Sequence, residues 1–182
     1  MLSISEQEER KTGKELYSYQ KGAIQKIFKC FETAVEDYHL LYQLPTGGGK
    51  TVIFSEIVSQ YLSTHKKKVL VMTHRIELCK QTSSVLTEFG VQNKVIDSKA
   101  NLGDQSEFQC FEAMVETLNN RLKDDKLDIS DIGLVIIDEA HYNSFTKLFK
   151  FFEKAFILGV TATPLSSNIE LPMTDNYNEL IV

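Results

Sequence analysis

The chain has 182 residues, of which 42% are hydrophobic and 25% are charged, and it contains only three prolines. This length and composition are typical of one ordinary globular domain, long enough to bury a sizeable core. The formal net charge of −5 argues against a protein that binds nucleic acid mainly by bulk positive charge, and the absence of any apolar run of about 18 residues argues against a membrane span.

The cysteines and the N-terminal residues indicate the compartment and the domain organisation. The three cysteines are odd in number and widely spaced, which predicts free thiols in a reducing, cytoplasmic setting rather than disulfides or a metal site. Residues 1–14 are polar, mixed in charge and without the apolar segment of a signal peptide, so we expect a flexible lead-in there. Residues 15–182 are expected to form one domain.

Along the chain, apolar residues recur with a helical period in some segments and form short Val- and Ile-rich runs in others. In chain order, the first half predicts a helix over residues 19–38, a strand over 39–44, a helix over 51–62, a strand over 69–73 and a helix over 75–89. The second half predicts a strand at 95–96, a loop over 97–106, strands over 108–111 and 134–137, a helix over 145–152, a strand over 156–160 and a poorly periodic tail over 165–182. Such alternation implies right-handed crossovers, so we expect an α/β fold with a mainly parallel sheet and helices on both faces.

A glycine-rich loop lies between the first predicted strand and the helix over 51–62. Three successive glycines let the backbone curl so that its N–H groups point at phosphate oxygens, and the following helix adds its positive N-terminus. Lys50 can reach the β- and γ-phosphates of ATP and the Thr51 hydroxyl can bind Mg²⁺, so the segment predicts a P-loop. The first glycine of the general pattern is Leu44 here, and the alternative is a plain glycine-rich turn. The loop residues expected to contact ATP are Thr46, Gly47, Gly48, Gly49, Lys50 and Thr51.

Two carboxylates, Asp138 and Glu139, follow the buried strand over 134–137. Ligands of α/β sheets gather at the carboxyl ends of strands, so Asp138 is expected to meet Mg²⁺ near Thr51. Glu139 is expected to orient and deprotonate the attacking water, with Lys50 as the second catalytic residue. Considered alone, the acidic pair would cap the next helix, and His141 would be a packing or surface residue.

The strand over 156–160 ends in two threonines that precede Pro164. Thr161 and Thr163 are expected to hydrogen-bond across to the acidic pair or to His141. The alternative is a strand end that is simply stopped by the proline, and both interpretations stay open from these residues alone.

Four segments coincide, in order, with motifs of superfamily 2 helicases: the P-loop and residues 71–78, 138–141 and 161–163. Residues 71–78 (VMTHRIEL), with Gln81 following, resemble motif Ia of the XPB-like and restriction-enzyme-like DEAD/DEAH group. Residues 16–20 (LYSYQ) resemble the adenine-reading element of that group, and residues 108–118 resemble its motif Ic. The resemblance covers about residues 16–165. It implies a three-layer, RecA-like P-loop NTPase domain, the ATP-binding half of an ATP-dependent helicase or translocase.

Several residue roles are implied by this resemblance. Gln20 would read the adenine edge and Tyr19 would shape that site, although Tyr17 stands where the group carries an arginine. His141, Thr161 and Thr163 would couple the nucleotide state to movement. Arg75 is the best candidate for a phosphate contact because its planar fork suits phosphate oxygens, the alternative being a solvated surface arginine. The residues implied to face nucleic acid are Thr73, Arg75, Gln81 and Thr117.

The resemblance also implies a second RecA-like domain that supplies an arginine finger, whereas the last arginine of this chain is Arg121. An arginine finger contributes about 10³–10⁵ in rate, so the chain alone is expected to bind ATP–Mg²⁺, turn over slowly and separate no strands. We interpret residues 171–182 as the start of the connection toward that domain. The leading hypothesis is an ATP-dependent motor on nucleic acid, DNA rather than RNA. The alternatives are a P-loop ATPase that acts on protein and a nucleotide-binding module without turnover.

Overall fold

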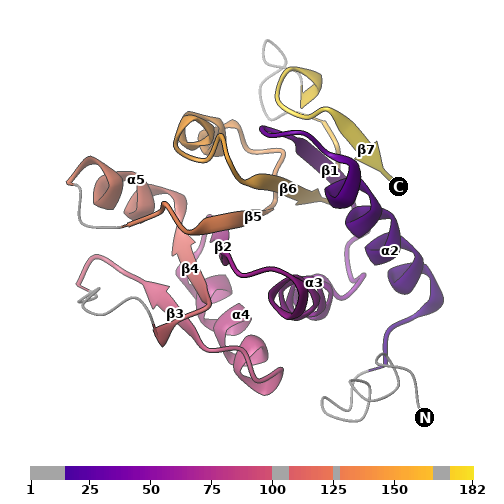
Figure 1. The fold of residues 1–182 in the computed structure, drawn as a ribbon, viewed down its shortest axis with the longest axis horizontal. Coiled ribbons are helices and arrows are strands. Elements are labelled where there is room, and N and C mark those ends of the chain that lie inside the picture. The colour runs from indigo at the N-terminus through magenta and orange to yellow at the C-terminus, as the bar shows by residue number, and fades with distance from the viewer. Residues whose placement is uncertain (1–14, 100–106, 125–127, 166–172) are drawn as a thin grey trace.

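A parallel β-sheet forms the centre of the molecule (Figure 1). The computed structural model describes residues 15–99, 107–124, 128–165 and 173–182. Within them, seven strands form one sheet in the order β3-β4-β2-β5-β6-β1-β7, and every pair is parallel. The strands are β1 (His39–Gln43), β2 (Lys68–Thr73), β3 (Asn93–Ile96), β4 (Cys110–Met114), β5 (Ile132–Asp138), β6 (Phe156–Thr161) and β7 (Glu179–Ile181).

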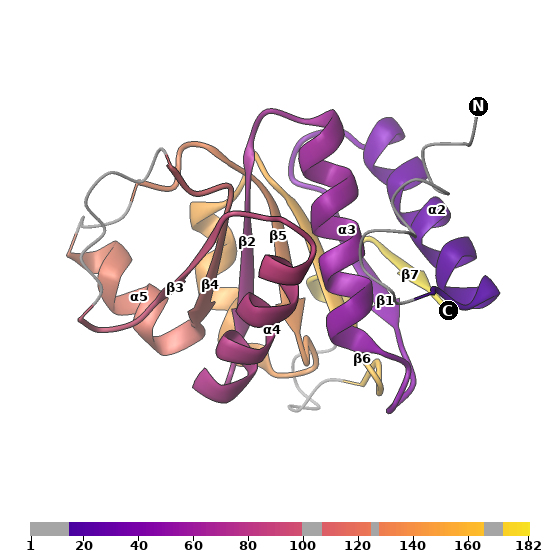
Figure 2. The same cartoon turned by 90° about the horizontal axis from the view of Figure 1, so that it is seen from below.

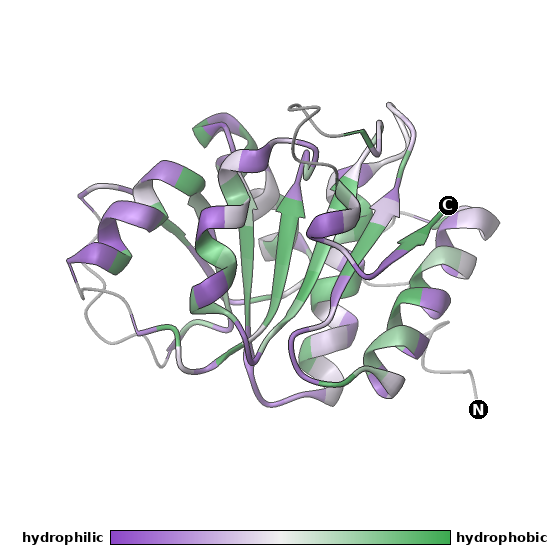
Figure 3. Ribbon diagram, turned by 90° about the horizontal axis from the view of Figure 1, so that it is seen from above, coloured by the Kyte–Doolittle hydropathy of each residue, from purple (hydrophilic) through white to green (hydrophobic). Residues whose placement is uncertain are grey.

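Alternate residues of the strands enter two separate hydrophobic cores, one on each face of the sheet. On β5, for example, Leu134 and Ile136 belong to one core, whereas Val135 and Ile137 belong to the other. Because a strand that is covered on both faces needs apolar residues at successive positions, the central strands consist largely of Val, Ile and Leu. Figure 3 shows the strands as the most apolar part of the molecule, between helices whose outer sides are polar.

The first core is covered by three helices, and Figure 2 shows two of them, α3 and α4, lying across that face of the sheet. The second core is covered by a short α-helix and a 3₁₀ segment. Helices thus flank both faces, which confirms the predicted three-layer α/β architecture. The first set is α2 (Ser18–Thr33), α3 (Lys50–Thr64) and α4 (Ile76–Glu88), and the second set is α5 (Val115–Lys123) and η2 (Asn143–Phe151). Within the described ranges, no helix is both long and apolar enough to cross a membrane.

Several predicted boundaries are wrong. Helix α2 ends at Thr33, before residue 38, and Val35 is 77% exposed instead of lying on the buried face. The predicted helix over 145–152 is the 3₁₀ segment η2, and helix α5 was not predicted. The tail contributes a further 3₁₀ turn, η3 (Met173–Asp175), and the edge strand β7, so these residues belong to the domain. The expected lead-in over 1–14 and most of the expected loop over 97–106 lie outside the described residues.

The parallel arrangement places the carboxyl ends of all the strands at one edge of the sheet. Strand β5 lies between β2 and β6, and β6 lies between β5 and β1. The P-loop after β1 and the acidic pair after β5 are therefore two strands apart, about 10 Å at the usual spacing between strands. A lysine side chain can span most of that gap.

Candidate nucleotide-binding site

The loop between β1 and α3 has the backbone of a phosphate-binding turn. Gly47 and Gly49 have φ angles of 80° and 77°, a region that glycine enters without the penalty paid by residues with a Cβ atom. Gly49 is the N-cap of the 15-residue helix α3, whose first two residues are Lys50 and Thr51. The backbone N–H of Leu44 donates to the carbonyl of Thr161 at 2.9 Å, which fixes the start of the loop against β6.

Lys50 joins the P-loop to the end of β5. Its ammonium forms an ion pair with the Glu139 carboxylate and lies 3.8 Å from Oδ1 of Asp138. The side chain of Lys50 is 21% exposed, so this pair is partly shielded from water. Residues that are far apart in the sequence thus converge on one positively charged group at the carboxyl edge of the sheet.

The backbone at Glu139 is turned sharply where the chain leaves β5. Glu139 has a φ angle of 54°, a left-handed conformation that is rare outside glycine and costs about 1–3 kcal/mol. The next residue, Ala140, donates its backbone N–H to the Val160 carbonyl at 3.0 Å, which holds the turn against β6. Strain of this kind persists only where surrounding contacts impose it, and here the turn brings the Glu139 carboxylate to the P-loop.

Asp138 is a buried carboxylate, and one of its oxygens makes no hydrogen bond to the described residues. The residue is 7% exposed, and its Oδ1 has no hydrogen-bond partner among the described residues. Burial raises the pKa of Asp138, while the nearby Lys50 ammonium opposes that shift. A buried carboxylate oxygen that makes no such hydrogen bond and lies beside a P-loop fits a Mg²⁺ ligand, because Mg²⁺ is usually held by one or two carboxylates together with phosphates and water. The described residues accordingly contain no group of three or more metal-ligating side chains that would hold an ion by itself.

The expected coupling residues form one hydrogen-bonded group. Nδ1 of His141 lies 2.8 Å from the Thr161 hydroxyl and 3.4 Å from Oε2 of Glu139. The Thr161 hydroxyl also donates to the Thr163 carbonyl at 2.9 Å, and the Thr163 N–H points back to that hydroxyl at 3.2 Å. Thr161 is fully buried, so β6 presents its hydroxyl to His141 rather than to solvent. His141 therefore bridges Glu139 of the acidic pair and the threonines that follow β6.

The N-terminus of α2 contacts the P-loop from the other side. The Gln20 amide nitrogen donates to the Gly48 carbonyl at 2.8 Å, and its oxygen accepts from the Tyr17 N–H at 2.8 Å. Each end of the amide therefore keeps one unused bonding position. Gln20 is only 3% exposed, whereas Tyr17 and Tyr19 stack in parallel at the surface with ring centroids 5.8 Å apart.

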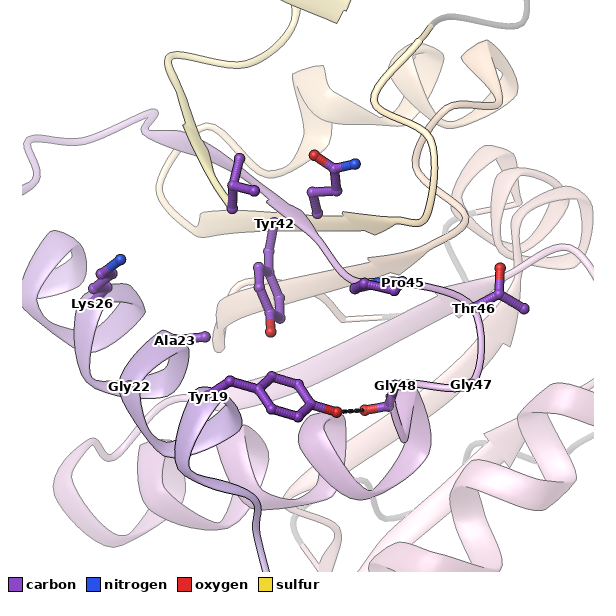
Figure 4. Close-up of a pocket in the computed structure, with 11 residues that line it drawn as sticks. Tyr19, Gly22, Ala23, Lys26, Tyr42, Pro45, Thr46, Gly47 and Gly48 are labelled. Carbon is purple, nitrogen blue, oxygen red and sulfur yellow. Dashed lines mark hydrogen bonds between the residues drawn. The ribbon is translucent and has the colours of Figure 1, made fainter.

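A pocket of about 710 Å³, the base-side pocket, opens between α2, β1 and the P-loop. Figure 4 shows Tyr19 reaching toward Gly48, whose carbonyl it contacts at 3.5 Å, and Tyr42 pointing from β1 toward α2. The pocket meets the P-loop at Thr46, Gly47 and Gly48 and does not extend to Lys50. Its wall also includes Val182. The P-loop thus has a roomy apolar side next to α2 and a charged side next to β5.

The four residues expected to face nucleic acid lie at or near the same edge but differ in exposure. Thr73 is 1% exposed, and its hydroxyl donates to the Arg75 carbonyl at 2.8 Å, so it shapes the turn after β2 and is not available at the surface. Arg75 is exposed and is the N-cap of α4, and Thr117 is half-buried in the first turn of α5. Gln81 is exposed further along α4. The acidic Glu77 and Glu116 occupy the first turns of the same two helices.

Some residues of this region were not predicted from the sequence. The Gln43 amide donates to the Ala162 carbonyl at 3.4 Å and so links the end of β1 to the segment after β6. His74 and Tyr142 pack against each other with ring centroids 4.4 Å apart, beside the nucleotide site. His74 lies between the predicted site residues Thr73 and Arg75, and Tyr142 follows His141. This adjacency is the sequence signal that could have identified them.

The family described as "Type III restriction enzyme, res subunit" matches residues 13–166 of the chain. The chain belongs to this family. This restriction-enzyme-type domain is 32% identical over 164 residues to the "Putative ATP-dependent helicase IRC3" of Saccharomyces cerevisiae. The match covers 81% of this chain and 23% of that protein. It is 29% identical over 169 residues to the ATP-dependent DNA helicase MPH1 of Scheffersomyces stipitis, covering 84% of this chain and 15% of that protein.

The fold of the restriction-enzyme-type domain is shared with solved helicase structures. The UvsW helicase from bacteriophage T4 superposes with a TM-score of 0.70 at 20% identity, over 92% of this chain and 60% of that one. The chain thus spans less than a quarter of IRC3 and MPH1 and under two thirds of UvsW. The family match, the curated helicase relatives and the shared fold together identify a RecA-like domain of the superfamily 2 helicase type.

Proposed function

We propose that this domain binds ATP–Mg²⁺ between the P-loop and the acidic pair and, with a second RecA-like domain, uses ATP hydrolysis to move along DNA. The observation that carries the proposal is the convergence of Lys50 on Glu139 and Asp138. A lysine that is held between two carboxylates, at the N-terminus of a helix and next to glycines with positive φ, is placed to receive phosphate oxygens.

In this proposal Asp138 and the Thr51 hydroxyl hold the metal. Bound there, Mg²⁺ supplies positive charge that offsets the charge developing on the phosphates. Lys50 exchanges its contact with Glu139 for one with the β- and γ-phosphates. Glu139, released from Lys50, orients a water molecule in line with the γ-phosphate and accepts its proton. His141 and the two threonines then respond to the change at Glu139.

The base of the nucleotide is proposed to lie on the α2 side of the P-loop. Gln20 retains one hydrogen and one lone pair, which together match the adenine edge, and the exposed Tyr19 offers an aromatic face. Tyr17 replaces an arginine of the related helicases and stacks on Tyr19, so aromatic stacking replaces a cationic contact at this position.

The track is proposed to be DNA because the relative MPH1 is named as a DNA helicase. Arg75 and the N-terminal turns of α4 and α5 would contact its phosphates, with Gln81 and Thr117 beside them. Because this domain carries a net charge of −5, we expect a few contacts at defined positions instead of binding by a broad basic surface. The arginine finger would come from the second RecA-like domain, without which turnover is expected to be about 10³–10⁵ slower.

The decisive experiment measures nucleotide affinity with a fluorescent ADP analogue and Mg²⁺. Lys50→Ala should weaken binding at least about 100-fold, because it removes the contact with the β-phosphate and leaves two carboxylates without their positive partner next to the bound phosphates. Lys29→Ala, an exposed lysine of α2, serves as the matched control and should bind as tightly as the wild type. Equal affinity of Lys50→Ala and wild type would refute the proposal.

Oligonucleotides separate this proposal from an ATPase that acts on protein. A 20-nucleotide single-stranded DNA should bind the chain at low salt, more tightly than the RNA of the same sequence. Failure of both nucleic acids to bind, with nucleotide binding intact, would favour a protein substrate instead.

A further inference from the structure

His74 lies between the proposed DNA-contacting turn and the residues that follow the acidic box. It sits after β2, next to Arg75, and β2 is the direct neighbour of β5 in the sheet. Its ring is 4.4 Å from that of Tyr142 and 4.5 Å from that of Phe145, both at steep angles. Its Nε2 is 3.3 Å from the Ser144 hydroxyl. The contacts of His74 therefore join the turn after β2 to the chain that continues from the acidic box.

Tyr142 also packs against a second ring. Its centroid is 4.3 Å from that of His141, with an angle of 36° between the ring planes. His141 in turn is 2.8 Å from the Thr161 hydroxyl and 3.4 Å from the Glu139 carboxylate. A continuous series of contacts thus runs from Glu139 through His141 and Tyr142 to His74, the residue before Arg75.

We propose that His141, Tyr142 and His74 form an aromatic relay that transmits the state of the nucleotide from Glu139 to the turn that carries Arg75. The relay residues are positioning residues and do not contact the reacting atoms. This inference rests on the proposed function, because the signal is the exchange of Lys50 from Glu139 to phosphate.

The geometry indicates how such a signal would travel. When the Lys50 ammonium leaves Glu139, that carboxylate loses its closest positive partner, and Nδ1 of His141 is a donor within reach. A turn of the His141 ring toward Glu139 weakens its bond to Thr161 and moves the face against which Tyr142 packs. Tyr142 is 43% exposed, so its ring has room to follow, whereas the half-buried His74 packs against both Tyr142 and the fully buried Phe145. Closely packed rings pass on such displacements because they cannot overlap.

Imidazole signals in a proton–carbon NMR spectrum of the full chain test this relay directly. The chain has four histidines, so the spectrum is simple, and His74→Asn and His141→Asn variants assign the two signals. Addition of Mg²⁺ and a non-hydrolysable ATP analogue should shift the signals of both His141 and His74. A shift of His141 with an unmoved His74 would overturn the relay, while leaving the proposed function intact.

Variants at Tyr142 distinguish transmission from simple proximity to the nucleotide. Tyr142→Leu should retain the nucleotide-induced shift of His141 and lose that of His74, whereas Tyr142→Phe, which keeps the ring, should retain both. Phe151→Leu is the matched control, because Phe151 is an aromatic residue of the same segment after the acidic box, is 38% exposed and is not in the series. A His74 response that persists in Tyr142→Leu would contradict the proposal. Nucleotide binding is measured separately by fluorescence, and its absence in the wild type would refute the proposed function and the relay together.

Discussion

Glu139 has an unusual backbone conformation, and its side chain is more exposed than that of Asp138. Its left-handed φ of 54° and its 33% exposed side chain place the carboxylate where it contacts Lys50 and can also reach a water molecule. Asp138, by contrast, is buried, so its carboxylate could contact a mobile water molecule only by moving away from the P-loop. The two adjacent carboxylates are thus suited to different tasks, one to the metal and the other to the water.

Glu139→Gln should retain nucleotide binding and lose hydrolysis by at least about 100-fold, the usual contribution of a positioned general base. The amide has the same shape, so the left-handed turn is kept, but it cannot accept a proton from water. A single-turnover assay of phosphate release, run alongside a fluorescence measurement of affinity, checks both parts. Normal hydrolysis by this variant would show that another residue activates the water.

Glu112 is a second buried carboxylate, and it takes no part in the proposed nucleotide site. It lies on β4 with no exposed surface, and neither of its carboxylate oxygens has a hydrogen-bond partner among the described residues. Burial raises the pKa of Glu112 from 4.5 to about 8. Because the raised pKa belongs to the folded state, its protonated form favours folding. The contribution of Glu112 to stability is therefore fully present below about pH 4.5 and is lost as the pH rises to about 8.

Glu112→Met should stabilise the domain more at pH 8.5 than at pH 5, because it replaces a group that must ionise in the core with one of similar shape. The difference between the two gains should exceed about 1.4 kcal/mol, the equivalent of one pKa unit. Urea unfolding at the two pH values measures it. The same substitution at the exposed Glu116 is the control, and an equal gain at both pH values for Glu112→Met would disprove the buried-acid explanation.

Single residues of the site were predictable where a motif fixed both type and spacing. Lys50, Asp138 and Glu139 were predicted to converge because strand ends of a parallel sheet share one edge, and their contacts confirm it. Thr73 was placed on the nucleic-acid track, but the sequence does not reveal that its hydroxyl turns inward to the Arg75 carbonyl. The direction of a side chain at a strand end depends on the turn that follows, which is set by tertiary packing.

At the scale of elements, strand β6 is tightly packed at Gly159. A Cβ atom at Gly159 would lie 2.7 Å from the Tyr177 ring and 2.8 Å from Cβ of Ala140, the residue after the acidic pair. Tyr177 precedes β7 and also packs edge-on against Phe149. The C-terminal segment, β6 and the turn after β5 therefore fit together without room for a methyl group.

Gly159→Ala should destabilise the domain by about 1–3 kcal/mol, the usual cost of overpacking a core. The penalty should shrink by at least about 0.5 kcal/mol when it is measured in a Tyr177→Ala background, because one of the two clashing groups is then gone. Gly22→Ala is the control: a Cβ atom there meets nothing within 4 Å, and alanine in α2 should stabilise by up to about 1 kcal/mol. An unchanged penalty in the double variant would show that Tyr177 is not the obstacle.

Long periodic elements were predicted well, and short ones were not. Helices α3 and α4 and the central strands follow their apolar periods closely. The apolar spacing over residues 145–152 predicts an α-helix, because residues three apart share a face in both kinds of helix, whereas the structure has the 3₁₀ segment η2. Strand β7 has three residues, and its position depends on contacts with β1, including the His39 N–H donating to the Asn178 side chain at 2.8 Å. No local pattern encodes such a contact.

At the scale of the whole molecule, the negative net charge bears on the proposed binding of DNA. Arg75→Ala should weaken binding of single-stranded DNA about equally for all sequences and should reduce the slope of log affinity against log salt concentration by about one. Fluorescence anisotropy at several salt concentrations measures both effects. Lys29→Ala, at the exposed surface of α2, should leave the slope unchanged. A sequence-selective loss in Arg75→Ala would contradict a backbone contact.

Fold class and family were accessible from the sequence because several motifs had to meet at one sheet edge. What the sequence could not provide is the side-chain order across that edge. The contact between His74 and Tyr142 is visible only in the three-dimensional structure, because His74 follows β2 and Tyr142 follows the neighbouring strand β5.

Val182 stands in the wall of the base-side pocket, together with Tyr19 and the P-loop. A fluorophore coupled at this position would report nucleotide occupancy without any label on the catalytic residues. For the same reason, a bulky aromatic side chain in place of Val182 would narrow the space next to the proposed base site and should weaken nucleotide retention.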